Sequence, residues 1–167
     1  MPLVLMTDDR EADWAGAAHR LPRGSLVVVR ARDAKRRARL AEELSFARLL
    51  IADDPDLAAE FGVGLHLPEK RMREASHWRA RHPGWIITAS AHSLATLLHA
   101  QCLDGVFLSP VFATTSHKGA KSLTPVRAAL IAAQSPVPVY ALGGITARNA
   151  ALLAPAFNGI AAISSLL

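Results

Sequence analysis

Short apolar segments recur along this chain at an even spacing, separated by longer stretches that mix polar and apolar residues. Each segment is rich in Val, Ile and Leu and is bounded by turn-forming residues, which is typical of buried parallel strands. The eight segments are 3–6, 26–29, 48–51, 63–67, 85–88, 105–108, 137–142 and 159–163. Their starts are about 22 residues apart on average, which leaves room for one short helix between neighbours.

The intervening stretches carry helix signals. The clearest helical stretches are 34–44, 56–61, 93–103, 124–134 and 146–154. Ser93 and Thr146 suit helix N-caps, and Pro125 suits a first helical turn. Strict alternation of strand and helix predicts an α/β protein with a parallel sheet covered by helices, and eight such strands predict a closed (β/α)8 TIM barrel.

The length of the chain makes this barrel compact. The sequence has 167 residues, whereas a typical barrel of this kind has about 250. It stops just after the eighth strand, so we expect one domain over residues 1–167, a barrel lacking the final helix. The uncovered strip of wall would then be covered by a partner subunit, as in a homodimer, or by the helix after the first strand. An open doubly wound sheet is the alternative, but residues 7–9 lack its glycine-rich turn.

Charge and hydropathy indicate which classes of ligand or partner to expect. The formal net charge is +5, which favours anionic ligands. No aromatic residues are interleaved with the basic residues at 30–39, which argues against nucleic acid. No apolar run approaches the roughly 20 residues that cross a bilayer, and residues 1–9 do not resemble a secretory signal. We therefore expect a cytoplasmic protein that binds phosphorylated small molecules rather than nucleic acid or a membrane.

The active sites of such barrels lie at the carboxyl ends of the strands. Gly143 and Gly144 end the seventh strand, where missing side chains let backbone N–H groups approach an anion. Thr146 would then open a helix whose N-terminus attracts phosphate. Ser164 and Ser165 follow the eighth strand and complete this predicted phosphate site. A plain left-handed turn is the alternative for the two glycines.

The segment after the sixth strand is rich in hydroxyls and cations. It contains Thr114, Ser116, His117 and Lys118. Such groups suit a second phosphate or a diphosphate, although a polar surface loop would have the same composition.

Three further positions at the predicted rim carry candidate chemistry. Arg30 and Arg32 are two residues apart, so on an extended chain they face the same way and could clamp a diphosphate; the alternative is ion pairing with Asp53 or Asp54. Asp53 could bind Mg²⁺ or cap a helix. His92 could act as a general acid or base or have only a structural role.

Several strings resemble the thiamine-phosphate synthase and thiazole tautomerase (TenI-like) family. They occur in order at 64–67 (GLHL), 90–93 (SAHS), 109–117 (SPVFATTSH), 138–145 (PVYALGGI) and 159–165 (GIAAISS). The resemblance covers most of the chain and is strongest from about residue 62 onward. The SPVF and LGGI strings are fairly specific as a pair.

This resemblance implies a (β/α)8 barrel and a reaction. In the synthase branch, an aminopyrimidine diphosphate loses pyrophosphate with the help of Mg²⁺, and the nitrogen of a thiazole phosphate captures the resulting cation. Carried over by position, the resemblance makes Arg30 and Arg32 the cationic pair and Asp53 a Mg²⁺ ligand. It places Thr114 and Ser116 at the diphosphate, and Gly144, Ile163 and Ser164 at the thiazole phosphate.

Departures from the family pattern leave three functions open. The family's Gln-x-Arg-x-Lys reads Val-Val-Arg-Ala-Arg at 28–32, and its Asn-Asp pair reads Ala-Asp at 52–53. A further metal-binding Asp falls near Arg71, with Glu69 as a nearby carboxylate. Synthase activity is the leading prediction. The alternatives are a metal-independent thiazole-phosphate tautomerase that uses His92, and a homologue that binds phosphorylated thiazole or thiamine without catalysis.

Overall fold

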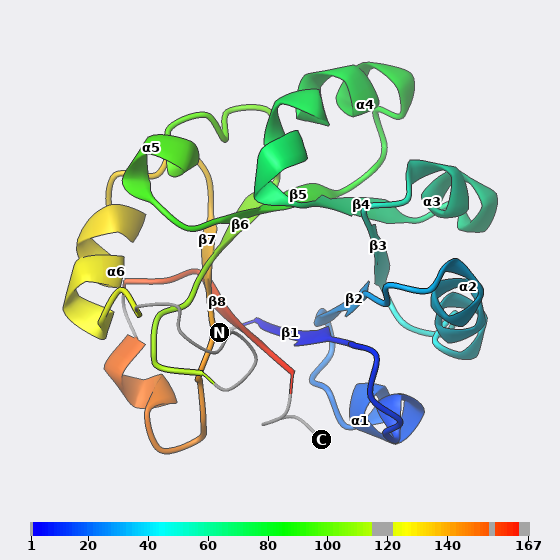
Figure 1. Cartoon of the computed structure of the whole chain (residues 1–167), viewed down its shortest axis with the longest axis horizontal. Helices are drawn as coiled ribbons and strands as arrows, with labels where there is room; N and C mark the ends of the chain where they lie inside the picture. Colours follow the sequence, from blue (N-terminus) through cyan, green and yellow to red (C-terminus); the bar gives the residue numbers. More distant parts are fainter. Residues whose placement is uncertain (1, 115–121, 154–155, 164–167) are drawn as a thin grey trace.

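Eight parallel strands close into a barrel in the computed structural model, which describes residues 2–114, 122–153 and 156–163. The strands pair in sequence order, and β1 closes the barrel by pairing with β8 (Figure 1). Their bounds are β1 Leu3–Met6, β2 Leu26–Val29, β3 Leu49–Ala52, β4 Gly64–Leu67, β5 Ile87–Ala91, β6 Gly105–Leu108, β7 Val139–Leu142 and β8 Gly159–Ala162. The predicted (β/α)8 fold is confirmed.

Short helices surround the barrel (Figure 1). They are α1 Trp14–His19, α2 Ala34–Glu43, α3 Pro55–Phe61, α4 Ala75–Arg81, α5 Leu94–Leu97 and α6 Pro125–Ala132, with the 3-10 helices η1 Glu69–Glu74 and η3 Ala150–Leu153. Aspartates cap three of them, because the side chains of Asp13, Asp33 and Asp54 accept hydrogen bonds from N–H groups of the first turns of α1, α2 and α3. No helix in the described ranges is long and apolar enough to cross a membrane.

Two apolar layers form because alternate residues of each strand face opposite sides of the sheet. Outward side chains such as Leu5, Val27 and Ile51 pack against the helices. The inward side chains fill the barrel itself, and they include Val4, Met6, Leu26, Val28, Leu50, Ala52, Phe107 and Ala161. The barrel interior is therefore a packed core, and any ligand must bind above it, at the rim.

Tyr140 fills the amino-terminal end of the barrel between two glycines. Its ring meets Phe107 edge-on at 5.4 Å. A Cβ added to Gly105 would come within 2.9 Å of the Tyr140 ring, and one added to Gly159 within 2.5 Å. Glycines on the two neighbouring strands are thus what makes space for this ring.

The structure bears on two expectations about the last third of the chain. Ile160 and Ala162, the outward side chains of β8, are buried within the chain itself, so the wall at β8 does not need the cover that we expected a partner subunit could provide. The helix predicted at 146–154 is absent from its described residues, 146–153, where the chain makes a turn and then the short η3. The side chain of Asn149 accepts from the N–H of Thr146 and donates to the carbonyl of Gly144, and these local bonds replace helical ones.

Candidate active site at the barrel rim

Arg30 follows the inward-facing Val28 by two residues and is therefore directed toward the barrel mouth. Its backbone is held by Thr7, a fully buried residue at the end of β1. The Thr7 hydroxyl donates to the Arg30 carbonyl at 3.0 Å and accepts from the Arg30 N–H at 2.9 Å. Neighbouring strand ends thus fix the point from which this guanidinium extends.

His66 lies inside the barrel near Arg30. Its Nδ1 is 2.9 Å from the Thr88 hydroxyl and its Nε2 is 3.1 Å from the Ser90 hydroxyl, while its ring stacks on Phe107 at 5.0 Å. Burial, together with the positive charge of Arg30, lowers the pKa of His66 to about 3. The imidazole is therefore neutral at physiological pH and contributes hydrogen bonds to the upper layer of the barrel.

Arg32 occupies a different environment from Arg30. Its side chain is 97% exposed and its Nε lies 3.6 Å from a carboxylate oxygen of Asp9. The Asp9 carboxylate also accepts from the Arg32 N–H at 2.8 Å. The chain turns after β2, so the alternation that would have directed both arginines inward ends before Arg32.

The two aspartates after β3 have separate partners. Asp54 caps α3 and accepts two hydrogen bonds from Arg37, at 2.7 and 3.1 Å. Asp53 has a left-handed φ of 57°, a conformation that Asp tolerates better than most residues. Its carboxylate accepts from Nη1 of Arg71 at 2.5 Å. Asp54 thus caps α3 and Asp53 pairs with Arg71, and among the described contacts neither aspartate pairs with Arg30 or Arg32.

Arg71 is held on its other side by Glu74. Its Nε and Nη2 donate to the two Glu74 carboxylate oxygens at 2.8 and 2.7 Å. Hydrogen bonding to Glu74, which outweighs desolvation, and to Asp53 raises the pKa of the Arg71 guanidinium. A permanent positive charge therefore stands beside Asp53 at the rim.

These residues do not fit a magnesium site built from side chains. Mg²⁺ needs carboxylate oxygens that are free to coordinate it, and Asp53 shares its carboxylate with Arg71. Glu69, the other nearby carboxylate, accepts from the backbone N–H of His92 at 3.0 Å. Within 2–114, 122–153 and 156–163, no three His, Cys, Asp or Glu side chains gather to hold a metal ion. The role of Asp53 as a metal ligand stays a prediction.

The Gly-Gly turn after β7 packs against the loop after β6. Val111 and Phe112 donate backbone hydrogen bonds to the carbonyls of Leu142 and Gly143, at 3.0 and 3.1 Å. Gly143 and Gly144 have left-handed φ values of 95° and 64°, and a Cβ at Gly144 would overlap the carbonyl of Ala113. The Gly-Gly turn is therefore in direct contact with the first residues of the β6 loop, which leads to Thr114.

The backbone of this turn offers hydrogen-bond donors. The N–H groups of Gly144 and Ile145 have no acceptor in the part of the chain that the structure describes, so they can bind a phosphoryl oxygen. Thr146 does not add a helix N-terminus, because its N–H already donates to Asn149 at 2.8 Å. Within the described residues the predicted anion site is therefore the Gly-Gly turn without a helix N-terminus, and the predicted Ser164 and Ser165 lie outside those residues.

His92 stands at the end of β5 with its ring orientation set by β6. Its Nδ1 lies 2.8 Å from the carbonyl oxygen of Ser109. A carbonyl can only accept, so Nδ1 carries the proton and Nε2 of the neutral ring carries the lone pair. The side chain is exposed, and its Nε2 has no partner within the described ranges. This geometry suits proton transfer, although a structural role would place Nδ1 in the same way.

The remaining predicted residues are only partly described. Thr114 is half-buried and ends the described part of the β6 loop, and Ile163 is half-buried after β8. Ser116, His117, Lys118, Ser164 and Ser165 lie outside the described residues.

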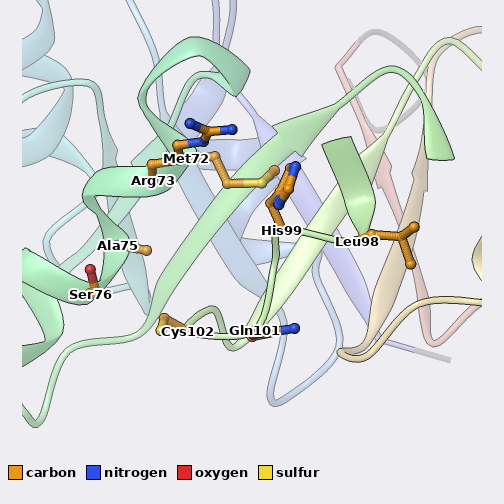
Figure 2. Close-up of a pocket in the computed structure, with 8 residues that line it drawn as sticks. All are labelled: Met72, Arg73, Ala75, Ser76, Leu98, His99, Gln101 and Cys102. Carbon is orange, nitrogen blue, oxygen red and sulfur yellow. The ribbon is translucent and has the colours of Figure 1, made fainter. Parts of the chain in front are cut away.

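A separate pocket lies outside the barrel wall, as Figure 2 shows. Its volume is about 220 Å³, and its walls come from η1, α4 and the segment after α5: Met72, Arg73, Ala75, Ser76, Leu98, His99, Gln101 and Cys102. None of the predicted site residues lines it, so the rim remains the candidate site.

Sequence comparison assigns this barrel to a family. The family model described as thiamine monophosphate synthase matches residues 5–166. The chain belongs to this family. Its relatives include the thiamine-phosphate synthase of Chlorobium luteolum, 32% identical over 180 aligned positions that cover 99% of this chain and 85% of the relative. The thiamine-phosphate synthase of Methanoculleus marisnigri is 34% identical over 131 positions, 72% of this chain and 60% of that one.

A solved structure agrees on the fold of this family member. The thiamine phosphate pyrophosphorylase of Pyrococcus furiosus superposes with a TM-score of 0.79, covering 98% of this chain and 85% of the other, at 22% identity. The family resemblance made Asp53 a Mg²⁺ ligand, and its ion pair with Arg71 differs from that expectation.

Sequence reasoning missed three features of this site. The Thr7 bonds to Arg30 and the placement of His66 between two hydroxyls depend on which strands are neighbours. The sequence did hint at the Arg71–Asp53 pair, because Arg71 lies near the position where the family pattern has a metal-binding Asp. Only the structure shows that it pairs with the remaining aspartate.

Proposed function

We propose that this chain is a thiamine-phosphate synthase-like transferase, which joins an aminopyrimidine diphosphate to a thiazole phosphate and releases pyrophosphate. The observation that carries the proposal is the match of residues 5–166 to the thiamine monophosphate synthase family. In the reaction, the bond between the pyrimidine methylene carbon and the diphosphate oxygen breaks, and a bond from that carbon to the thiazole nitrogen forms.

The rim has the groups that this reaction needs. Negative charge grows on the departing diphosphate, so cations directed at it lower the barrier. Arg30 is the cation that the barrel directs toward its mouth, and Thr7 holds its backbone. The N–H groups of Gly144 and Ile145 are donors for the thiazole phosphate. The two anions then bind on different strand ends, with the reacting atoms between them.

The other assigned residues keep the roles that their positions imply. Thr114, Ser116, His117 and Lys118 form the diphosphate loop, while Gly143, Ile163, Ser164 and Ser165 complete the thiazole-phosphate side. Arg32 adds positive charge at the edge of the rim. The partners are small phosphorylated molecules, and the proposed location is the cytoplasm.

The named relatives favour synthesis over the two alternatives. The relatives from Chlorobium luteolum and Methanoculleus marisnigri are both named thiamine-phosphate synthase. Neither a thiazole-phosphate tautomerase nor a non-catalytic binding protein is favoured by these comparisons.

The direct test is product formation from the two substrates. Purified protein is incubated with both, in Mg²⁺ and separately in EDTA, and thiamine phosphate and pyrophosphate are quantified by chromatography and a coupled assay. We expect the two products to form in equal amounts, and neither to form when one substrate is omitted. Isomerisation of the thiazole phosphate alone, without coupling in either buffer, would instead support the tautomerase.

A further inference from the structure

The Asp53 carboxylate is already paired with a cation, the guanidinium of Arg71. Nη1 of Arg71 donates to it at 2.5 Å, and Glu74 fixes the same guanidinium from the other side through two hydrogen bonds. Two carboxylates around a central positive charge are the arrangement in which carboxylates of a metal site surround their ion. Here the central charge belongs to the chain itself.

A divalent cation at Asp53 would have to displace or approach this guanidinium. Two positive groups about 4 Å apart repel each other by several kcal/mol near a protein surface. Release of Arg71 would also leave Glu74 without the partner to which it presents both oxygens. The ion pair therefore opposes metal binding by occupying the carboxylate and by its charge.

Arg71 still has donors for an anion. A guanidinium has five N–H groups, and three of them donate to Glu74 and Asp53. The other two have no partner within residues 2–114, 122–153 and 156–163. The side chain is 28% exposed, so these two N–H groups can reach a phosphoryl oxygen from the solvent side.

We propose that the guanidinium of Arg71 takes the position of a divalent cation beside Asp53, so that this chain holds the diphosphate of its ligand there without a metal. Only the identity of the anion rests on the proposed function. The exclusion of the metal rests on the Asp53–Arg71–Glu74 contacts alone.

The first experiment measures metal binding directly. Mn²⁺ binding to the wild-type chain, Arg71→Asp and Arg73→Asp is followed by electron paramagnetic resonance of free Mn²⁺. Arg73 is exposed on the same 3-10 helix, so its variant makes the same charge change away from Asp53. We expect weak binding to the wild type and to Arg73→Asp, and binding at least about tenfold tighter to Arg71→Asp, where a carboxylate replaces the cation. Circular dichroism checks that each variant folds.

The second experiment measures anion binding without metal. Pyrophosphate affinity is determined by calorimetry in EDTA for the wild type, Arg71→Gln and Arg73→Gln. We expect Arg71→Gln to bind about tenfold more weakly, because charge-assisted hydrogen bonds to phosphate are lost, and Arg73→Gln to match the wild type.

Two results would overturn the proposal. One is tight Mn²⁺ binding by the wild type that Asp53→Asn abolishes, because the metal would then bind the Asp53 carboxylate despite Arg71. This measurement does not depend on the folding of any Arg71 variant. The other is unchanged pyrophosphate affinity in Arg71→Gln. A chain without synthase turnover would contradict the proposed function but would leave the Mn²⁺ result unaffected.

Discussion

The hydroxyl of Thr7 both donates to the carbonyl of Arg30 and accepts from its N–H, at 3.0 and 2.9 Å. One side chain thus satisfies both backbone groups of the arginine that faces the barrel mouth. Because Thr7 is fully buried, no water can take its place without a rearrangement of the strand ends.

Thr7→Val removes this hydroxyl and keeps the shape of the side chain. We expect the free energy of unfolding to fall by about 1–3 kcal/mol, because two backbone groups lose their partner, and pyrophosphate to bind more weakly as Arg30 loses its fixed position. Urea unfolding and calorimetry measure the two effects. Thr7→Ser keeps the hydroxyl and should retain pyrophosphate affinity; equal losses in both variants would mean that the methyl group, not the hydrogen bonds, matters.

Arg30→Ala and Arg32→Ala form a matched pair. We expect Arg30→Ala to weaken pyrophosphate binding by at least about tenfold and far more than it weakens binding of inorganic phosphate, since a diphosphate offers more charge to the guanidinium. Arg32→Ala should weaken pyrophosphate binding less than Arg30→Ala does, because the Arg32 side chain is exposed and lies against Asp9 at the edge of the rim. Calorimetry of the two variants with both anions decides this. Equal losses of both anions in Arg30→Ala would indicate a structural role.

His66 makes the stability of the barrel depend on pH. Its folded-state pKa of about 3 lies below the ordinary value of 6.5. Between these values the unfolded chain takes up a proton that the folded chain does not, so the free energy of unfolding falls as pH drops from 6.5 toward 3. The contribution reaches about 1.4 kcal/mol per pH unit.

His66→Gln should reduce this slope, because Gln does not titrate. Urea unfolding at several pH values between 7 and 4.5 measures it for the wild type, His66→Gln and His99→Gln. His99 is exposed, so its variant should keep the wild-type slope. An identical slope in all three proteins would show that His66 is not the group responsible.

His92→Gln tests proton transfer at the rim. If Nε2 of His92 moves a proton in the isomerisation of a thiazole phosphate, the rate of that reaction should fall by about 10²-fold in His92→Gln. His77, which is exposed on α4, provides the control variant His77→Gln with an expected wild-type rate. A wild-type rate in His92→Gln would remove this histidine from the mechanism and leave it a structural role.

The barrel could be predicted because its strands are buried on both faces and so appear as unbroken apolar runs. The ends of the strands were harder to predict. The apolar run at 85–88 begins before the strand, which spans Ile87–Ala91, because Trp85 instead stacks on His82 at 3.7 Å. The absent helix after β7 was equally hidden, since the bonds of Asn149 to Thr146 and Gly144 depend on the conformation of the turn.

The candidate site was predictable only where a single residue type carries the chemistry. The Gly-Gly turn could be predicted in this way, because a left-handed backbone conformation favours glycine. The structure also shows why a charge at Gly144 would be an ambiguous test: the new side chain would displace Ala113 as well as repel an anion. The separation of Arg30 from Arg32 and the pairing of Arg71 with Asp53 arise from the path of the loops, on which local sequence carries little information.

The position of the Tyr140 ring between Gly105 and Gly159 limits the route by which ligands can enter and leave the enzyme. The ring closes the amino-terminal end of the barrel. In the described part of the molecule, ligands can therefore enter and leave only at the rim. Two substrates and two products would share it. The strand ends that carry Thr7, Arg30 and Gly144 would therefore line the route of every one of these molecules.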